Sequence, residues 1–352
     1  MSTTLTRPNL PNRKLSSPPT RPLPTRPLGT TGMEITRVGF GAWAIGGGAW
    51  SFGWGSQEDA KSLAAIRHAA ERGVNWIDTA AAYGIGHSEE MVARALKNIP
   101  RSDRPYVFTK GGLGSDPANP MEKPRRIGSA NSLRQEVEGS LKRLGIDRID
   151  LYQMHWPAED VRLEEYWSTL LELKEQGKLR AVGLSNHGTA QLELAESIGH
   201  VDTLQPPFSA IKRGFAASEL PWCVAHNTGV IVYSPMQSGL LTGKFTEARA
   251  TQLAADDWRS RSADFTGQGL RRNLHLAAAL QPVAYRHGTS VAAVAIAWTL
   301  GFRGVTAAIV GARSADQVDG WIEAATLTLQ ARDMEEIAQA IAMSGAGEGP
   351  TR

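Results

Sequence analysis

Four side chains able to move protons stand at the ends of apolar segments of this 352-residue sequence: Asp78, Tyr83, Lys110 and His155. A phenol is a weak acid at neutral pH, with a reference pKa of about 10, and a nearby ammonium stabilises the phenolate that remains after proton loss. A carboxylate keeps such an ammonium charged, and an imidazole can donate to a carbonyl oxygen. The residue types therefore favour reduction of a carbonyl group, with delivery of a proton to its oxygen, over hydrolysis.

Two other chemistries are weaker interpretations of the same residues. Lys110 could form an imine with a carbonyl, but a neighbouring Asp78 favours the charged amine over the neutral one that this reaction needs. A metal site is less favoured still, because His87, His155 and His187 lack a ligand-like spacing such as a helical i, i+4 pair. We expect no metal.

Strand-like and helix-like segments alternate along the chain, and the reactive residues fall at strand ends. We predict eight strands: VGFGAW (38–43), NWIDTA (75–80), YVFTKG (106–111), RIDLYQMH (148–155), RAVGLSN (180–186), DTLQPPF (202–208), GVIVYSP (229–235) and VTAAIVG (305–311). Amphipathic segments between them, several ending in glycine, predict helices. Eight such units predict a (β/α)8 TIM barrel, an α/β fold whose chemistry lies at the carboxyl ends of the strands.

The rival fold, a doubly wound open sheet, usually carries Gly-x-Gly-x-x-Gly after its first strand. Here the segment from Gly39 to Gly46 has a different spacing, and so has Gly111-Gly112-Leu113-Gly114. A nicotinamide cofactor would therefore be bound in another way.

The ends of the chain differ from its body. Residues 1–27 hold seven prolines and five basic residues without an acid, which predicts a disordered arm and leaves the rest of the chain slightly acidic. We expect a hairpin over 28–37 that turns on Gly32, one barrel domain over 28–345 and a flexible tail over 346–352.

Composition also limits where and with what the protein acts. Cys223 is the sole cysteine and lies in a helical pattern, and no apolar run approaches the length of about 18 residues that a membrane span needs. We expect a soluble, cytoplasmic protein with a small-molecule carbonyl or alcohol substrate and neither a nucleic-acid nor a membrane partner. The sequence does not predict an oligomeric state.

Two long connections, 112–128 and 240–269, would border the catalytic edge of such a barrel and are typical of substrate walls or lids. Tryptophans occur in or near these loops, and an aromatic wall suits apolar or aromatic carbonyl compounds. The candidates for the substrate pocket are Trp54, Trp156 and Trp258, with Trp43 as a further one.

Several segments together resemble the aldo-keto reductases from about residue 27 to 330. They are IDTAAAYGIGHSEEMVARAL, RIDLYQMHWP, GKLRAVGLSN, TLQPPFS and VYSPMQSGLLTGKF. The resemblance is strongest to bacterial members of the general-stress and inositol-operon type. It implies a (β/α)8 barrel that uses NADPH without a dinucleotide fingerprint, with Tyr83 as general acid, Lys110 and Asp78 tuning it, and His155 orienting the carbonyl.

The resemblance also implies a set of cofactor-binding residues. For the carboxamide, the nicotinamide ring and the pyrophosphate it gives Ser185, Asn186, Gln205, Tyr233, Ser234, Met236, Ser238, Gly239, Leu240 and Lys244. For the adenosine end it gives Gly311, Arg313 and Gln317, with Arg313 pairing with a 2′-phosphate, so that NADP(H) is preferred and NAD(H) remains possible. Gly320 and Trp321 stand where many relatives carry an acid and an asparagine that contact adenine.

Two functions follow from these expectations. The first is reduction of aldehydes and ketones to alcohols by hydride transfer from NADPH. The alternative is a cofactor-sensing regulatory or scaffold protein of the same fold with little turnover, for which the basic arm of residues 1–27 would be the docking segment.

Overall fold

A computed structural model describes residues 22–48, 50–254 and 257–352, and its centre is a closed barrel of eight parallel strands. In barrel order these are β10 (Thr203–Gln205), β11 (Gly229–Val232), β12 (Ala307–Gly311), β3 (Val38–Gly41), β4 (Trp76–Asp78), β5 (Tyr106–Gly111), β8 (Ile149–Met154) and β9 (Leu179–Ser185). Each strand lies within one of the eight predicted segments, apart from Leu179 at the start of β9. The predicted (β/α)8 barrel is confirmed.

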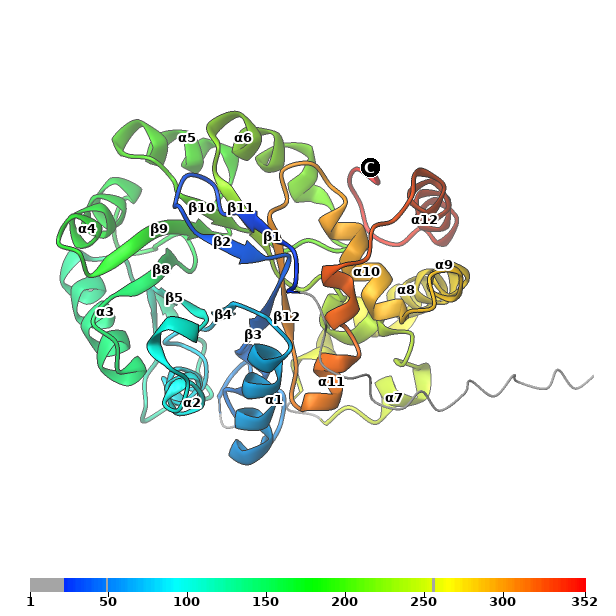
Figure 1. The fold of residues 1–352 in the computed structure, drawn as a ribbon, viewed down its shortest axis with the longest axis horizontal. Coiled ribbons are helices and arrows are strands. Elements are labelled where there is room, and N and C mark those ends of the chain that lie inside the picture. Colours follow the sequence, from blue (N-terminus) through cyan, green and yellow to red (C-terminus); the bar gives the residue numbers. More distant parts are fainter. Residues whose placement is uncertain (1–21, 49, 255–256) are drawn as a thin grey trace, which may run out of the picture.

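Helices surround the barrel as an outer ring (Figure 1). The helices of the described residues are α1 (Asp59–Glu71), α2 (His87–Leu96), α3 (Ala130–Leu144), α4 (Leu163–Glu175), α5 (Thr189–Ile198), α6 (Glu219–His226), α7 (Glu247–Thr251), α8 (Gly267–Ala279), α9 (Gln281–Arg286), α10 (Val291–Leu300), α11 (Ala315–Asp319) and α12 (Ala331–Ser344). α3 ends at Gly145, whose φ of 65° allows the left-handed cap that its sequence predicts. No helix in these three ranges is long and apolar enough to cross a membrane.

A hairpin closes the amino-terminal end of the barrel, where its strands β1 (Thr25–Pro27) and β2 (Glu34–Thr36) pair antiparallel (Figure 1). Its Leu28, Met33 and Ile35 are fully buried against inward-facing barrel residues that include Trp76 and Phe108. Because this apolar plug fills one end, access to the interior lies at the carboxyl ends of the strands.

The hairpin corrects the expected boundary of the arm. β1 lies inside residues 1–27, and Arg26 donates to the main-chain oxygen of Val305 at 2.6 Å. These last residues of the segment are ordered because the paired strand gives their backbone hydrogen-bond partners. The rest of the expected arm, residues 1–21, lies outside the described residues.

The expected flexible tail, residues 346–352, is also corrected. Ala346 is buried, and the Arg213 guanidinium donates to the oxygens of Ala346 and Gly349 at 2.9 and 3.1 Å. A Cβ on Gly347 would lie 1.7 Å from the Ile211 oxygen, so the chain passes this point only as glycine. Hydrogen bonds from the Arg213 side chain to the backbone of the tail, which composition does not reveal, hold these residues in place.

The long connections at the catalytic edge contain short elements of their own. The 112–128 segment forms a small antiparallel pair, β6 (Leu113–Gly114) with β7 (Arg125–Arg126), and the 240–269 segment contains α7 and short 3-10 turns. The connection from β3 to α1, residues 42–58, is a third long segment at this edge, and sequence reasoning did not single it out.

Candidate active site

The four reactive residues meet at the carboxyl edge of the barrel. Asp78 ends β4 and Lys110 lies near the end of β5, while Tyr83 precedes α2 and His155 follows β8. The Lys110 ammonium donates to Asp78 Oδ1 at 2.5 Å and to the Thr79 oxygen at 2.9 Å, and lies 3.5 Å from the Tyr83 hydroxyl. The Tyr83 and His155 rings meet edge to face, with centroids 5.7 Å apart. The arrangement joins a proton donor to a buried ion pair.

Burial and mutual attraction act in opposite directions on this ion pair. Burial raises the pKa of the Asp78 carboxyl and lowers the pKa of the Lys110 ammonium, and each is opposed by the charge of the other. Gln205 Nε2 also donates to Asp78 Oδ2 at 2.8 Å, which favours the carboxylate. An ammonium held in this way is a poor imine-forming nucleophile.

The two groups that would face a substrate are held neutral. Burial, followed by the charge of Asp78, raises the pKa of the Tyr83 phenol well above its ordinary value. The expected lowering of the Tyr83 pKa by Lys110 does not set the direction of the shift, and Tyr83 keeps its proton until negative charge develops beside it. Burial and the charge of Lys110 lower the pKa of His155 well below its ordinary value, so its ring is uncharged at neutral pH.

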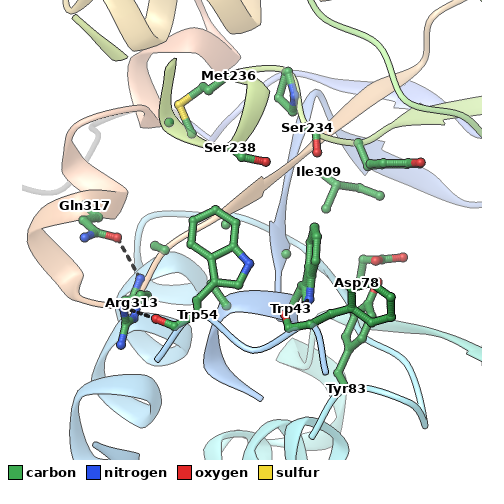
Figure 2. Close-up of a pocket in the computed structure, with 18 of the residues that line it drawn as sticks. Trp43, Trp54, Asp78, Tyr83, Ser234, Met236, Ser238, Ile309, Arg313 and Gln317 are labelled. Carbon is green, nitrogen blue, oxygen red and sulfur yellow. Dashed lines mark hydrogen bonds between the residues drawn. The ribbon is translucent and has the colours of Figure 1, made fainter. Parts of the chain in front are cut away.

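A cavity of about 630 Å³ runs from this group along the carboxyl edge (Figure 2). It is lined by most of the predicted site residues: Asp78, Tyr83, His155, Ser185, Asn186, Gln205, Tyr233, Ser234, Met236, Ser238, Gly239, Lys244, Gly311, Arg313, Gln317, Trp54 and Trp156. Lys110 lies behind Tyr83 and acts on the cavity through it.

Two predicted site residues lie elsewhere. Leu240 is fully buried in the hydrophobic core, where its apolar side chain packs instead of lining the cavity. Trp258 stacks on Trp43, with ring centroids 6.2 Å apart, and so supports the cavity wall from behind.

The end of the cavity next to Asp78, Tyr83, Lys110 and His155, here called the tetrad, carries a fixed amide. Asn186 Nδ2 donates to the His155 oxygen at 2.9 Å and to Ser185 Oγ at 3.0 Å, and its Oδ1 accepts from the Tyr233 hydroxyl at 2.8 Å. Asn186 also has a left-handed φ of 62°. These bonds place a flat aromatic ring and amide groups beside His155, a surface suited to a nicotinamide ring and its carboxamide.

The middle of the cavity is bordered by an unusual turn after β11. Ser234, Gln237 and Ser238 have φ of 56°, 43° and 52°, and Gly239 follows with 100°. Residues with a Cβ rarely adopt this left-handed region of positive φ, and its use here indicates a functional constraint. Such turns present backbone N–H groups as a concave anion site, which suits a pyrophosphate.

The far end of the cavity holds Arg313 and Gln317 (Figure 2). The Arg313 guanidinium donates to Gln57 Oε1 at 2.7 Å, to the Trp54 oxygen at 3.0 Å and to the Ser56 oxygen. Gln317 Oε1 accepts from the Arg313 main-chain N–H at 2.9 Å. In the structure, Arg313 thus fixes the 42–58 segment at the edge of the cavity.

Sequence reasoning missed several residues that shape the cavity, among them Trp50, Phe52 and Arg259. The aromatic pair lies in a glycine-rich stretch that gave no strand or helix signal, although its Trp-Ser-Phe-Gly-Trp composition was a possible indication. Arg259 packs over the Trp54 ring, 4.5 Å from its centroid, and pairs with Asp257 at 2.7 Å. This contact joins the 42–58 and 240–269 segments at the cavity wall.

The residues present fit a nicotinamide dinucleotide, because amide groups, a left-handed turn and a basic end follow one another along one cavity. Gly320 and Trp321 line the adenosine end, so adenine would meet a surface without the acid and asparagine of many relatives. Ser185 and Asn186 would hold the nicotinamide. The turn at 234–239 would hold the pyrophosphate.

Comparisons with known proteins agree with this geometry. Residues 37–342 match the model of the Aldo/keto reductase family. Aldo-keto reductase YhdN of Bacillus subtilis strain 168 is 36% identical over 313 residues, covering 88% of this chain and 91% of that protein. A protein of Escherichia coli K12 named NADH-specific methylglyoxal reductase is 33% identical over 330 residues, 90% of this chain and 98% of its own.

A solved structure gives the same result in three dimensions. The glycerol dehydrogenase of Gluconobacter oxydans superposes with a TM-score of 0.83 at 34% identity, covering 93% of this chain and 97% of that one. The chain belongs to the aldo/keto reductase family and is an NAD(P)H-dependent oxidoreductase of carbonyl compounds.

Proposed function

We propose that the protein reduces aldehydes and ketones with NADPH, with Tyr83 as the general acid. The observation that carries this proposal is the meeting of the Tyr83 hydroxyl, the Lys110 ammonium and the His155 ring at a cavity of about 630 Å³ that also reaches Arg313 and Gln317.

The chain's own residues would complete the reduction. The bound cofactor supplies a hydride, whose electron pair forms the new C–H bond. Tyr83 donates its proton to the carbonyl oxygen as that oxygen gains charge, and the Lys110 ammonium stabilises the phenolate that remains. Asp78 keeps Lys110 charged, the neutral His155 orients the carbonyl, and a proton from solvent restores Tyr83.

The choice of NADPH rests on Arg313. Its guanidinium donates to neutral oxygens, and a phosphate dianion makes stronger, charge-assisted bonds with arginine. A 2′-phosphate at this end of the cavity would compete for Arg313 with the 42–58 segment. One relative is named NADH-specific, so both cofactors belong in the test.

The apolar and aromatic surface beside Tyr83, formed by Trp43, Trp50, Trp156 and Leu113, favours aromatic or apolar carbonyl compounds. The assay should follow oxidation of NADPH and of NADH with an aromatic aldehyde and with methylglyoxal, and reduction of NADP⁺ and NAD⁺ with glycerol. Methylglyoxal and glycerol are included because they occur in the names of the relatives.

Tyr83→Phe tests the assignment of the acid. We expect kcat to fall by about 100-fold or more, the usual contribution of a positioned acid, while NADPH still quenches the tryptophan fluorescence with similar affinity. Turnover by Tyr83→Phe equal to that of the wild type would refute the role of Tyr83. A wild-type protein that binds NADPH but turns over no carbonyl in a broad panel would refute the proposed reaction.

A further inference from the structure

Each charged member of the ion pair has a threonine next to it in sequence, and both threonines point outward to α2. Thr79 follows Asp78, and its Oγ1 lies 2.8 Å from Ser88 Oγ. Thr109 precedes Lys110, and its hydroxyl donates to Glu89 Oε1 at 2.6 Å. The first turn of α2 therefore binds the ends of both β4 and β5.

Glu89 differs from Thr79, Ser88 and Thr109 because it carries a charge, and its carboxylate is fully buried. Arg143 of α3, whose side chain is 29% exposed, donates from Nε to Glu89 Oε2 at 2.6 Å. A carboxylate in such a place has a large desolvation cost, and apolar side chains of similar size often pack at least as well. Both oxygens are engaged, one by Thr109 and one by Arg143, so the charge has a fixed position behind β5.

The end of β5 is held at a second point by α3. Glu136 Oε2 accepts from the Gly112 N–H at 2.8 Å, and the Gly111 oxygen accepts from the His155 N–H at 3.0 Å. The backbone that carries Lys110 is thus joined to Glu89 on one side and to His155 on the other. A shift of β5 would move Lys110 relative to both Asp78 and Tyr83.

We propose that Glu89 is a positioning residue for carbonyl reduction, which holds Lys110 in place through Thr109 and sets a fixed negative charge behind its strand. The inference deepens the proposed function and rests on the role given there to Lys110. It requires no contact of Glu89 with substrate or cofactor.

The charges around Lys110 set the direction of the expected effect. The titratable groups near Lys110 are Asp78 and Tyr83 from β4 and its loop, His155 after β8, and Glu89 of α2 on the other side of β5. Asp78 and, more weakly, Glu89 raise the pKa of Lys110 against the effect of burial. Loss of the Glu89 charge should therefore make the ammonium lose its proton at lower pH.

Glu89 has ionisable neighbours of its own that must be considered in this experiment. Arg143 and Glu136 of α3 and Tyr152 of β8 are close enough to feel its charge. A variant that removes the carboxylate charge leaves Arg143 and Glu136 beside each other, so this pair still contains one charge of each sign.

The first experiment tests the mechanical link. Thr109→Val removes the hydroxyl and keeps the shape, and Thr109→Ser keeps the hydroxyl. We expect Thr109→Val to lower kcat for the aromatic aldehyde about tenfold, equal to about 1.4 kcal/mol in the transition state, with little change in KM for NADPH. Thr109→Ser should restore most of the lost kcat.

The second experiment tests the charge. Lysine labelled with ¹³C and ¹⁵N, with Lys110→Met to assign the signal, reports the titration of the Lys110 ammonium by NMR in the intact protein. Glu89→Gln should move this titration to lower pH. Glu90→Gln, the matched control, removes the same charge from the exposed neighbouring residue and should leave the titration in place.

The outcomes separate this inference from the proposed function. If the wild type reduces carbonyls but Thr109→Val keeps its kcat and Glu89→Gln keeps the Lys110 titration, the positioning role is refuted and the reaction stands. If the wild type reduces nothing, the reaction is refuted and the NMR titration still tests the link to Lys110. If Glu89→Gln fails to fold, the Thr109→Val and Thr109→Ser pair decides.

Discussion

The hydrogen-bond partners of the Arg313 guanidinium indicate a role that its residue type alone does not predict. The resemblance to the aldo-keto reductases implies that Arg313 pairs with a 2′-phosphate, yet in the structure it donates to the oxygens of Trp54 and Ser56 and to Gln57. These bonds fix the segment that carries Trp54 against Arg259. Arg313 would therefore connect recognition of the 2′-phosphate to the position of that segment.

Arg313→Gln should reduce selectivity for NADPH. A hydrogen bond to a charged group is typically worth about 1.5–3 kcal/mol, so KM for NADPH should rise by about 10-fold or more, while KM for NADH changes less. Steady-state kinetics with both cofactors and one aldehyde measures the ratio. Arg303→Gln, at an exposed residue before β12, is the control and should leave both values unchanged. Equal losses for the two cofactors would show that Arg313 acts only through the loop.

At the scale of elements, the strands were predictable and the loops were not. The eight strand segments are short apolar runs, which indicate burial, and three of them carry Asp78, Lys110 and His155 near their ends, which indicates the barrel edge. The segments 42–58 and 240–269 have no periodic pattern, and contacts between distant residues, such as Trp54 with Arg259, determine their shape. The Glu89–Thr109 contact was missed for the same reason, because it joins a helix to a strand across 20 residues of sequence.

β5 gives a test of how tightly the catalytic edge is packed. A Cβ added to Gly111 would lie 1.9 Å from the Tyr152 hydroxyl oxygen and 2.9 Å from Glu136 Oε2. Gly111→Ala should therefore lower the free energy of unfolding by about 1–3 kcal/mol and displace the strand that carries Lys110. Urea unfolding and kcat measure the two effects.

Gly214→Ala is the matched control for this substitution. A Cβ at Gly214 meets no heavy atom within 4 Å, so its effect on stability should stay within about 0.5 kcal/mol. A Gly111→Ala protein as stable and as active as Gly214→Ala would mean that Tyr152 moves away freely.

At the scale of the whole molecule, the residues that close and stabilise the barrel lie at the opposite end from the candidate active site. The hairpin and the apolar plug of Leu28, Met33 and Ile35 close one end, and the tetrad and the cavity occupy the other. The sequence predicted the fold and the meeting of Asp78, Tyr83, Lys110 and His155, because strand ends lie together at one edge of a barrel. It did not predict the order at residues 346–352, which depends on Arg213 and on backbone contacts that no local pattern shows.

Buried histidines make the stability of the whole chain depend on pH. His187, a metal-ligand candidate only in the weakest interpretation of the sequence, is 3% exposed, and its ring nitrogens lie 2.8 Å from the Tyr166 hydroxyl and from the Ser185 oxygen. Burial lowers the pKa of His187 to about 4. The unfolded chain, with a histidine pKa of about 6.5, therefore binds a proton between pH 6.5 and 4 that the folded protein does not.

Because the unfolded state binds more protons in this window, the free energy of unfolding should fall as the pH falls below about 6.5. At pH 5 the contribution of His187 should be about 2 kcal/mol lower than at pH 7. Urea unfolding of the wild type and of His187→Gln at both pH values measures it, and the variant should lose about 2 kcal/mol less than the wild type between them. His155 acts with the same sign in both proteins, so the difference isolates His187. The exposed His275→Gln is the control and should keep the wild-type difference. If His187→Gln also keeps it, the imidazole of His187 binds its proton equally well in the folded protein.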